Sequence, residues 1–307
     1  MNNKALVLAS FVADSLALGA HWIYDTDKID AAFGTIRSLQ HPLPDSFHKN
    51  RKKGHFTHYG DQTLVLLRSI VEHDGFSLEK FARDWHDALR TYNGYIDKAT
   101  KETLAGLENG QSPQTCGSSS ADLGGAARIA PLVYRYQNHP DQLLAAVREQ
   151  TQLTHNNPTV LVGAEVLARI TLKVLAGIRP MEAVEEVLDE GVNDLDLDLK
   201  VRAGLDSAGE DTRKTIKAFG QACSIASAMP GVIHLIATYE SDLETALVEN
   251  VMAGGDSAAR GLAAGMILGA HLGIKAIPLE WLGDMRAYDT IMELLADERP
   301  ADNGDEP

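Results

Sequence analysis

Three aspartates share a local setting that could support chemistry. Asp14, Asp61 and Asp256 each lie beside small residues in or next to an expected helix, and the last two directly follow a glycine. Carboxylates that converge would form a hard oxygen site for a divalent cation. His21 follows Asp14 by seven residues and would face the same side of a helix that continued for two turns. Helix capping explains Asp61 and Asp256 equally well, so both interpretations stay open.

Other side chains could hold an organic ligand near these acids. The rings of Trp22, Tyr24 and Tyr59 could stack on a base, although aromatic residues beside helices also build cores. Small residues in the segment 116–134 would leave backbone N–H groups free for an anion. The residues singled out there are Gly117, Ser118, Ser119 and Gly124. His155 could anchor a polar group, act as a general base or be a structural histidine.

The stretch 254–273 predicts the centre of the fold. Gly261, Gly265 and Gly269 fall four residues apart and would line one face of a helix. Each glycine inside a helix costs about 1 kcal/mol relative to alanine, so we expect a close neighbour against this stripe, either another helix backbone or a ligand. Asp256 stands where an N-cap would, at the positive end of the helix dipole.

Hydrophobic periodicity predicts about a dozen helices and no strand, which indicates one all-α domain over residues 1–296. One of these helices is expected over 211–229, ended by Pro230. Residues 297–307 are expected to form a disordered acidic tail. The segment 33–58 contains four of the eleven histidines and a basic run at 49–53, and we interpret it as a long loop. Such a loop could be a lid or a phosphate clamp, or its basic run could simply be solvated.

Composition limits the function classes. A net charge of −15 argues against nucleic-acid binding, because a polyanion would be repelled. No apolar run approaches the roughly 20 residues of a membrane span, and we interpret the apolar N-terminus as a buried helix. Two cysteines without a paired motif fit a reducing compartment, so we expect a cytoplasmic protein. No P-loop, dinucleotide fingerprint or zinc-binding spacing is present.

Five motifs follow one another in the order ADSLALGAHWIYD, YGDQT, GSSSADLGGAARIAP, LTHNNP and GGDSAARGLAAG. Together they resemble the ADP-ribosylglycohydrolase family, above all its J1-crystallin-like branch, over roughly residues 5–273. The resemblance implies an all-α, single-domain orthogonal helical bundle. It also implies hydrolysis of the glycosidic bond between ADP-ribose and a protein side chain or small acceptor. In that family two magnesium or manganese ions are held mainly by TDDT and GDTDT motifs.

The chain departs from both metal motifs. Asp61 and Thr63 match the TDDT motif, whereas Gly60 and Gln62 replace its first threonine and its second acid. In the second motif, Asp256 and Ser257 are kept, and Ala258 and Ala259 replace the second acid and threonine. His21 lies near where active members often place a glutamate.

Charge decides what these departures imply. Two divalent cations would bring four positive charges, against two negative charges from Asp61 and Asp256. We therefore expect no dinuclear centre, and at most one weakly held Mg²⁺ on Asp61, Thr63, Asp256 and Ser257.

Two functions remain. In the first, an ADP-ribose-like ligand lies against Asp14, Trp22, Tyr24, Tyr59, the 117–125 loop and His155, and its glycosidic bond is hydrolysed with Asp61, Asp256 and His21 as catalytic groups. In the second, the chain is an inactive nucleotide- or ribose-binding protein, or a crystallin-like structural protein.

Overall fold

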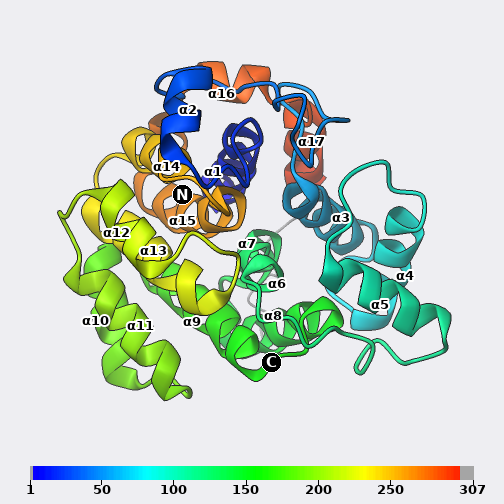
Figure 1. The fold of residues 1–307 in the computed structure, drawn as a ribbon. Helices are drawn as coiled ribbons and strands as arrows, with labels where there is room; N and C mark the ends of the chain where they lie inside the picture. Colours follow the sequence, from blue (N-terminus) through cyan, green and yellow to red (C-terminus); the bar gives the residue numbers. More distant parts are fainter. Residues whose placement is uncertain (1–2, 298–307) are drawn as a thin grey trace.

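The computed structural model describes residues 3–297. The regular elements among these residues are all helices, which confirms the all-α prediction. The longer elements are arranged around a central helix pair (Figure 1). In chain order they are α1 (Asn3–Ala17), α2 (Thr26–Phe33), α3 (His58–Glu72), α4 (Leu78–Leu89), α5 (Lys98–Glu108), α6 (Gly124–Ala127), α7 (Ala130–Tyr136), α8 (Pro140–Thr154), α9 (Pro158–Leu175), α10 (Pro180–Glu190), α11 (Leu195–Asp206), α12 (Thr212–Phe219), α13 (Ile225–Thr238), α14 (Leu243–Met252), α15 (Ser257–Leu272), the 3₁₀ turn η1 (Ile274–Ala276), α16 (Leu279–Asp284) and α17 (Tyr288–Asp297). Of the predicted acidic tail, residues 298–307 lie outside the described part of the chain.

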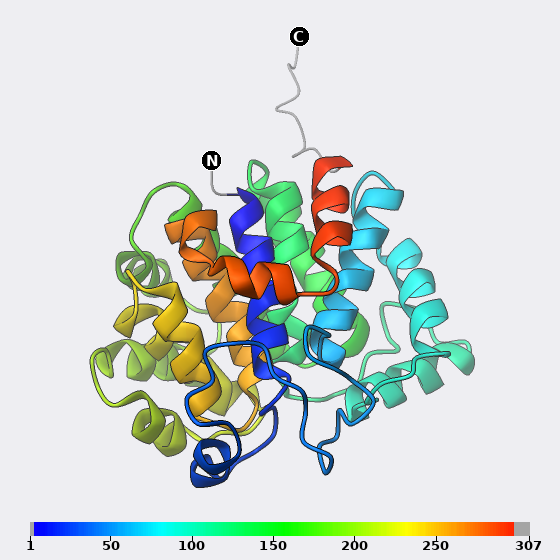
Figure 2. The same ribbon diagram turned by 90° about the horizontal axis from the view of Figure 1, so that it is seen from above.

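The glycine stripe of α15 packs on α1. Of the two predicted neighbours, another helix backbone or a ligand, the structure shows the helix backbone. A Cβ at Gly265 would lie 2.6 Å from the Ala9 carbonyl oxygen, and one at Gly269 would lie 2.6 Å from the Ala5 carbonyl oxygen. A Cβ at Gly261 would lie 3.3 Å from that of Ala13. The partner residues therefore descend along α1 as the glycines ascend along α15, so the two helices are antiparallel with their backbones in close contact (Figures 1 and 2).

This packing brings three helix ends together. Asp14 lies in the last turn of α1, and Asp256 is the N-cap of α15, as predicted, with its side chain accepting from Ala259 N–H. The N-terminus of α3 lies at the same end, because Thr57, its N-cap, donates two hydrogen bonds to Asp14. The loop 34–57 crosses this end of the bundle (Figure 2).

Two helix boundaries differ from the sequence prediction. Helix α3 begins at His58 with Thr57 as its cap, so Asp61 lies in the first turn and is not the cap. The helix expected over 211–229 is broken at Gly220, which has φ +101°, and α13 continues through Pro230. Proline removes one helical hydrogen bond, and the almost continuous burial of α13 around it compensates for that loss.

A helix that continued for two turns beyond Asp14 would have carried His21 on the same side, but the helix does not continue that far. Helix α1 ends at Ala17, and Trp22 adopts φ +65°, which side chains other than glycine rarely do. Trp22 N–H donates to the Gly255 carbonyl at 2.9 Å, and Gly255 N–H donates to the Ile23 carbonyl at 2.8 Å. These bonds join the turn to the residues before α15, so His21 is brought to Asp256.

Within residues 3–297 no helix combines the length and apolar character needed to cross a membrane.

We predict that Gly265→Ala destabilises the fold by about 1–3 kcal/mol, because the added methyl group overlaps the Ala9 carbonyl oxygen and must separate the two helices. Gly283→Ala is the matched control, since Gly283 lies in α16 and a Cβ there meets nothing within 4 Å. Urea denaturation followed by circular dichroism measures both free energies of unfolding. Equal stability of the two variants would contradict the close packing of α15 on α1.

Candidate functional site

Asp14 is fully buried below the end of the helix pair. Its carboxylate accepts hydrogen bonds from the N–H and hydroxyl of Thr57, at 2.7 and 2.6 Å, and from Gly60 N–H at 3.2 Å. A Cβ on Gly60 would lie 2.4 Å from Asp14 Oδ2, so the close approach requires glycine there. Burial raises the pKa of Asp14 to about 7, although the Thr57 hydrogen bonds act in the opposite direction. Asp14 thus holds the start of α3 in place.

Asp61 is paired with a cation of the protein itself. Arg51, from the basic run of the loop, and the Tyr92 hydroxyl both donate to Asp61 Oδ2. The Arg51 guanidinium also lies over the Tyr92 ring, 4.9 Å from its centroid. Burial raises the pKa of Asp61 and the charge of Arg51 opposes that rise. The positive charge that a metal ion would bring to this carboxylate is therefore supplied by Arg51.

Gln62 is a buried hydrogen-bonding hub. Its Oε1 accepts from Trp85 Nε1 at 2.9 Å and from Arg128 Nη1 at 2.6 Å, and its Nε2 donates to the Thr100 hydroxyl at 3.3 Å. Arg128 is itself 1 % exposed. An acid at position 62 could bind a metal ion through its carboxylate. Gln62 offers a single side-chain oxygen, and that oxygen already accepts two hydrogen bonds.

Asp256 is buried at the start of α15, where both its oxygens have partners. Oδ1 accepts from Ala259 N–H at 3.1 Å, and Oδ2 accepts from the Tyr59 hydroxyl at 3.0 Å. Burial raises the pKa of Asp256, and the Ala259 N–H, Arg260 and Tyr59 lower it again. His21 Nδ1 lies 3.8 Å from Oδ1. An aspartate, an imidazole whose pKa is lowered by burial and a phenol thus meet at one point.

Several polar atoms around Asp256 are buried without a hydrogen-bond partner. They include both ring nitrogens of His21, the Ser257 hydroxyl and Nη1 of Arg260. A buried polar group that lacks a partner costs about 1–3 kcal/mol, and native proteins have few of them. The concentration of such groups beside one carboxylate indicates a place where a polar ligand, water or ion completes their hydrogen bonding.

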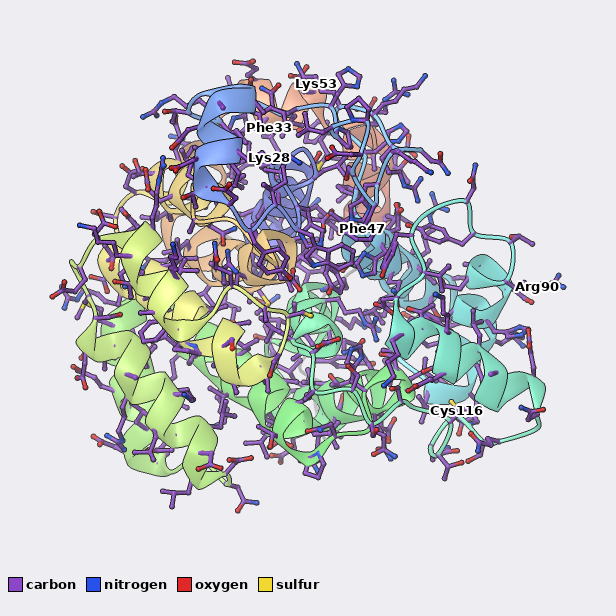
Figure 3. All side chains as sticks on the ribbon, in the orientation of Figure 1. Lys28, Phe33, Phe47, Lys53, Arg90 and Cys116 are labelled. Carbon is purple, nitrogen blue, oxygen red and sulfur yellow. The ribbon has the colours of Figure 1, made fainter. Side chains whose placement is uncertain are left out.

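An aromatic cluster covers this point. Its members are His21, Trp22, Phe47, His48, His58, Tyr59 and Tyr95. Trp22 is its centre, with ring centroids 4.4 Å from His21 and 4.8 Å from Tyr95. Phe47, labelled in Figure 3, is 62 % exposed and closes the cluster from the solvent side. The loop 34–57 contributes Phe47 and His48, so it covers the site as a lid would.

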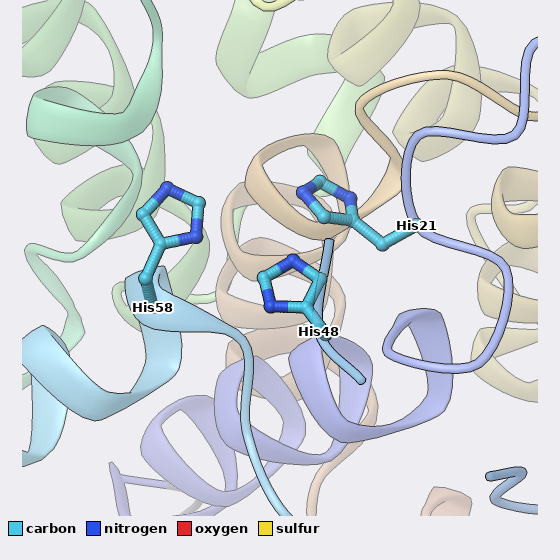
Figure 4. Close-up of side chains that lie close together, drawn as sticks. All are labelled: His21, His48 and His58. Atoms are coloured by element: carbon cyan, nitrogen blue, oxygen red, sulfur yellow. The ribbon is translucent and has the colours of Figure 1, made fainter. Parts of the chain in front are cut away.

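Three histidines of the cluster are directed toward one another (Figure 4). His21, His48 and His58 come from the turn after α1, from the loop and from the start of α3, and all three are buried. One ring nitrogen from each lies within 4.8 Å of those of the other two. Burial lowers the pKa of His48 to about 3 and also lowers that of His21, and the neighbouring imidazoles lower both further. Beyond the trio, Asp97 Oδ2 lies 3.1 Å from His58 Nε2.

The 117–125 loop is tied to its neighbours. Ser118 N–H donates to the Thr154 carbonyl at 3.1 Å, and its hydroxyl donates to Glu102. A Cβ at Gly117 would lie 2.0 Å from the Gln152 carbonyl oxygen, and one at Gly124 would lie 2.3 Å from the Tyr59 ring. Contacts within the protein therefore explain both glycines, and of the predicted loop contacts Ser119 alone is exposed.

His155 is buried beside this loop. Its Nδ1 lies 2.8 Å from the Thr154 hydroxyl, which in turn accepts a hydrogen bond from Arg128. Burial, followed by the charge of Arg128, lowers the pKa of His155 to about 4. A Cβ at Gly125 would lie 2.7 Å from the same ring nitrogen. These contacts fit the structural alternative for His155.

Two pockets open near the predicted residues. One of about 240 Å³ is lined by His21, Trp22, Tyr24, Phe47 and others. Another of about 410 Å³ contains Asp61 in its wall. The first is smaller than the roughly 300–1,000 Å³ of pockets that enclose a drug-sized ligand.

The donor set does not fit two magnesium ions. Arg51 pairs with Asp61, the Gln62 oxygen has two donors, and Ala258 offers no ligand atom. The Thr63 hydroxyl, also predicted as a ligand, donates to the Tyr59 carbonyl at 2.9 Å. Among residues 3–297, the triads of potential ligands within 4.8 Å of one another are His21–His48–His58 and Glu72–His73–Asp84, and neither includes a predicted metal ligand.

The comparisons with known proteins identify the family. The ADP-ribosylglycohydrolase family model matches residues 3–305, so the chain belongs to this family. Crystallin J1A of Tripedalia cystophora is 24 % identical over 298 residues, covering 91 % of this chain and 90 % of that protein. ADP-ribosyl-[dinitrogen reductase] glycohydrolase of Rhodospirillum rubrum is 26 % identical over 236 residues, covering 76 % and 74 %. A solved structure described as an ADP-ribosylglycohydrolase-related protein complex superposes with a TM-score of 0.80 at 23 % identity, covering 96 % of both chains, and confirms the predicted fold.

Sequence reasoning missed His48, His58, Asp97 and Tyr95. The density of histidines in the segment 33–58 was a usable signal. The spacing from His21 to His48 to His58 follows no metal-binding motif, however, because three separate segments supply the rings.

We predict that Gln62→Met lowers the free energy of unfolding by about 3 kcal/mol, because Trp85 Nε1 and Arg128 Nη1 lose a buried acceptor. Gln152→Met is the control, since Gln152 makes its hydrogen bond to the Gln114 carbonyl at the surface, and we expect a change within about 0.5 kcal/mol. Guanidinium denaturation measures both. A loss no larger than the control's would show that Gln62 is not a hub.

His155 should contribute a loss of stability on mild acidification. Its pKa is about 4 in the folded protein and about 6.5 when unfolded, so the unfolded chain takes up the proton first as pH falls. The stabilisation is complete above pH 6.5 and is lost toward pH 4, with a slope of at most about 1.4 kcal/mol per pH unit. In a urea titration across this range, His155→Gln should flatten the slope and the partly exposed His86→Gln should not. Equal slopes in wild type and His155→Gln would refute this assignment.

Proposed function

We propose that the chain hydrolyses the glycosidic bond of an ADP-ribosyl or related ribosyl group without the family's magnesium pair. Family membership supports the reaction class. The observation that carries the proposal is the group of unpartnered buried polar atoms of His21, Ser257 and Arg260 around Asp256, beside a pocket of about 240 Å³.

The chemistry follows from charge. A ribosyl glycoside breaks through a transition state with positive charge on the sugar ring, and a nearby carboxylate stabilises that charge. Asp256 supplies the carboxylate, and His21, uncharged at neutral pH because of its burial, accepts the proton of the attacking water. The oxygen of that water bonds to the sugar C1 as the bond to the leaving group breaks. The leaving group takes up a proton from solvent, and His21 then returns to solvent the proton that it accepted. Asp61 lies in the wall of the second pocket, where Arg51 neutralises its charge, and it is the alternative catalytic carboxylate.

Magnesium enters this proposal at most as one weakly bound ion at Asp61 or Asp256. We also propose a cytoplasmic location, in keeping with two free cysteines, and no nucleic-acid partner, in keeping with the net charge of −15.

A second candidate is a protein without catalysis, either a ribose binder or a crystallin-like structural protein. The Arg51–Asp61 pair and the Gln62 hub favour it, because both commit former metal-binding positions to internal hydrogen bonds. The similarity to crystallin J1A points the same way.

Calorimetry with ADP-ribose in EDTA and then in magnesium tests the first proposal. We expect binding of equal affinity in both buffers, and at least a tenfold loss in Asp256→Asn. Asp242→Asn is the matched control, because Asp242 caps α14 through Thr245 as Asp256 caps α15, away from the cluster. Release of free ADP-ribose from ADP-ribosyl-arginine and ADP-ribosyl-serine peptides in EDTA then measures catalysis.

Three results would count against this proposal. Binding that requires magnesium would restore a family-type metal site. An equal loss in both aspartate variants would reduce Asp256 to a helix cap. Absence of binding in both buffers would favour the structural alternative.

A further inference from the structure

The proposed hydrolysis uses one of the three buried histidines of the cluster, His21, and gives no role to His48 or His58. His21, His48 and His58 are each at most 2 % exposed, and all six of their ring nitrogens lack a hydrogen bond of good geometry. Three imidazoles packed together in this way waste donors and acceptors that water would satisfy outside. Something that binds imidazole nitrogen would repay that cost.

We propose that His21, His48 and His58 form a mononuclear site for a divalent transition-metal ion of the zinc type. Imidazole suits zinc and its neighbours in the first row, whereas magnesium favours oxygen. Zinc bound by three histidines leaves a fourth position open. The site differs from the expected magnesium positions in its residues and in its preferred ion.

The geometry supports three ligands. Zinc–nitrogen bonds of about 2.1 Å place the nitrogens of a tetrahedral site about 3.4 Å apart. One ring nitrogen of each histidine already lies within 4.8 Å of those of the other two, so small side-chain rotations would bring the three to the distance of a zinc site. The rings come from three segments, and the centroid of His48 lies 5.2 Å from that of His21 and 5.7 Å from that of His58.

Carboxylates stand behind two of the rings. His21 Nδ1 faces Asp256 Oδ1 at 3.8 Å, which leaves Nε2 for an ion. His58 Nε2 faces Asp97 Oδ2 at 3.1 Å, which leaves Nδ1. A carboxylate on the far nitrogen of a metal-bound histidine fixes the ring and its tautomer, and is a regular companion of such sites. Asp97 is itself fixed, because it caps α5 and accepts from Thr100 N–H.

The second triad, Glu72–His73–Asp84, is a weaker candidate. His73 Nε2 lies 2.9 Å from Asp84 Oδ2, and that same oxygen accepts from the Ser69 hydroxyl. Its ligands are thus already paired with one another near the surface, and Glu72 is exposed. It serves as the internal control.

An ion at the histidine site would fasten the loop 34–57 to the ends of α1 and α3, because His48 belongs to the loop. The pocket beside His21 and Phe47 provides the route from solvent. The metal site does not rest on the proposed hydrolysis. An ion on His21 Nε2 would prevent that nitrogen from accepting a proton, so the base role of His21 belongs to the metal-free protein, and an ion can be counted whether or not a substrate is turned over.

The test uses tag-free full-length protein, stripped with chelator and titrated with Zn²⁺ by calorimetry. Metal content after dialysis is counted by mass spectrometry. We expect one ion per chain, a higher melting temperature with Zn²⁺ than with EDTA, and no such effect of Mg²⁺. Co²⁺ in place of Zn²⁺ should give the strong visible absorption of a four-coordinate ion.

Four variants locate the ion. His48→Asn should weaken Zn²⁺ binding at least 100-fold, and Asp97→Asn should weaken it by about 10–100-fold, as expected for a group that orients a ligand. His55→Asn, in the same loop but outside the triad, and His73→Asn, in the second triad, should bind as wild type does. Circular dichroism confirms that each variant is folded.

The proposal is overturned if stripped wild type takes up no Zn²⁺, or if His48→Asn binds as tightly as His55→Asn. Loss of binding in His73→Asn alone would assign the ion to the surface triad instead. A site that is lost while ADP-ribose binding persists, or the reverse, separates this inference from the proposed function.

Discussion

The close packing of α15 on α1 is the constraint on which the rest of the structure depends. Glycines every fourth residue let the α15 backbone contact the carbonyl groups of α1, and no side chain larger than hydrogen fits at Gly265 or Gly269. Antiparallel packing in this register places the end of α1 and the start of α15 together. Asp14 then holds the start of α3 at the same point. The candidate site lies where these three helix ends meet.

Near these helix ends a cation of the protein itself lies opposite one of the acids. Members of its family are expected to bring acids together around cations, whereas here Arg51 supplies the charge opposite Asp61 and the uncharged Gln62 accepts a hydrogen bond from the guanidinium of Arg128. Buried charge is costly unless it is paired, and the partly buried Asp61 is paired with Arg51. Imidazoles occupy the space next to it.

The loop 34–57 gains its importance from what it adds to this site. It has no helix, yet it supplies Arg51 to Asp61, His48 to the histidine triad and Phe47 to the outer face of the aromatic cluster. These three contacts fix the position of the loop over the site. Trp22, held at φ +65° by hydrogen bonding to Gly255, is the surface on which the loop packs.

Spacing along the chain was enough to predict the helical class, the glycine stripe with its close neighbour, the capping role of Asp256 and the family. The sequence also predicted too few acids at positions 61 and 256 for a metal pair, which stays a prediction. It misplaced the start of α3 and the course of α13, since tertiary burial there outweighs local capping and proline signals. Only the folded chain decided that Arg51 meets Asp61 and that His21, His48 and His58 meet at all. Those contacts join segments that no periodicity links, and they form because the packing of α1, α3 and α15 brings their ends to one place.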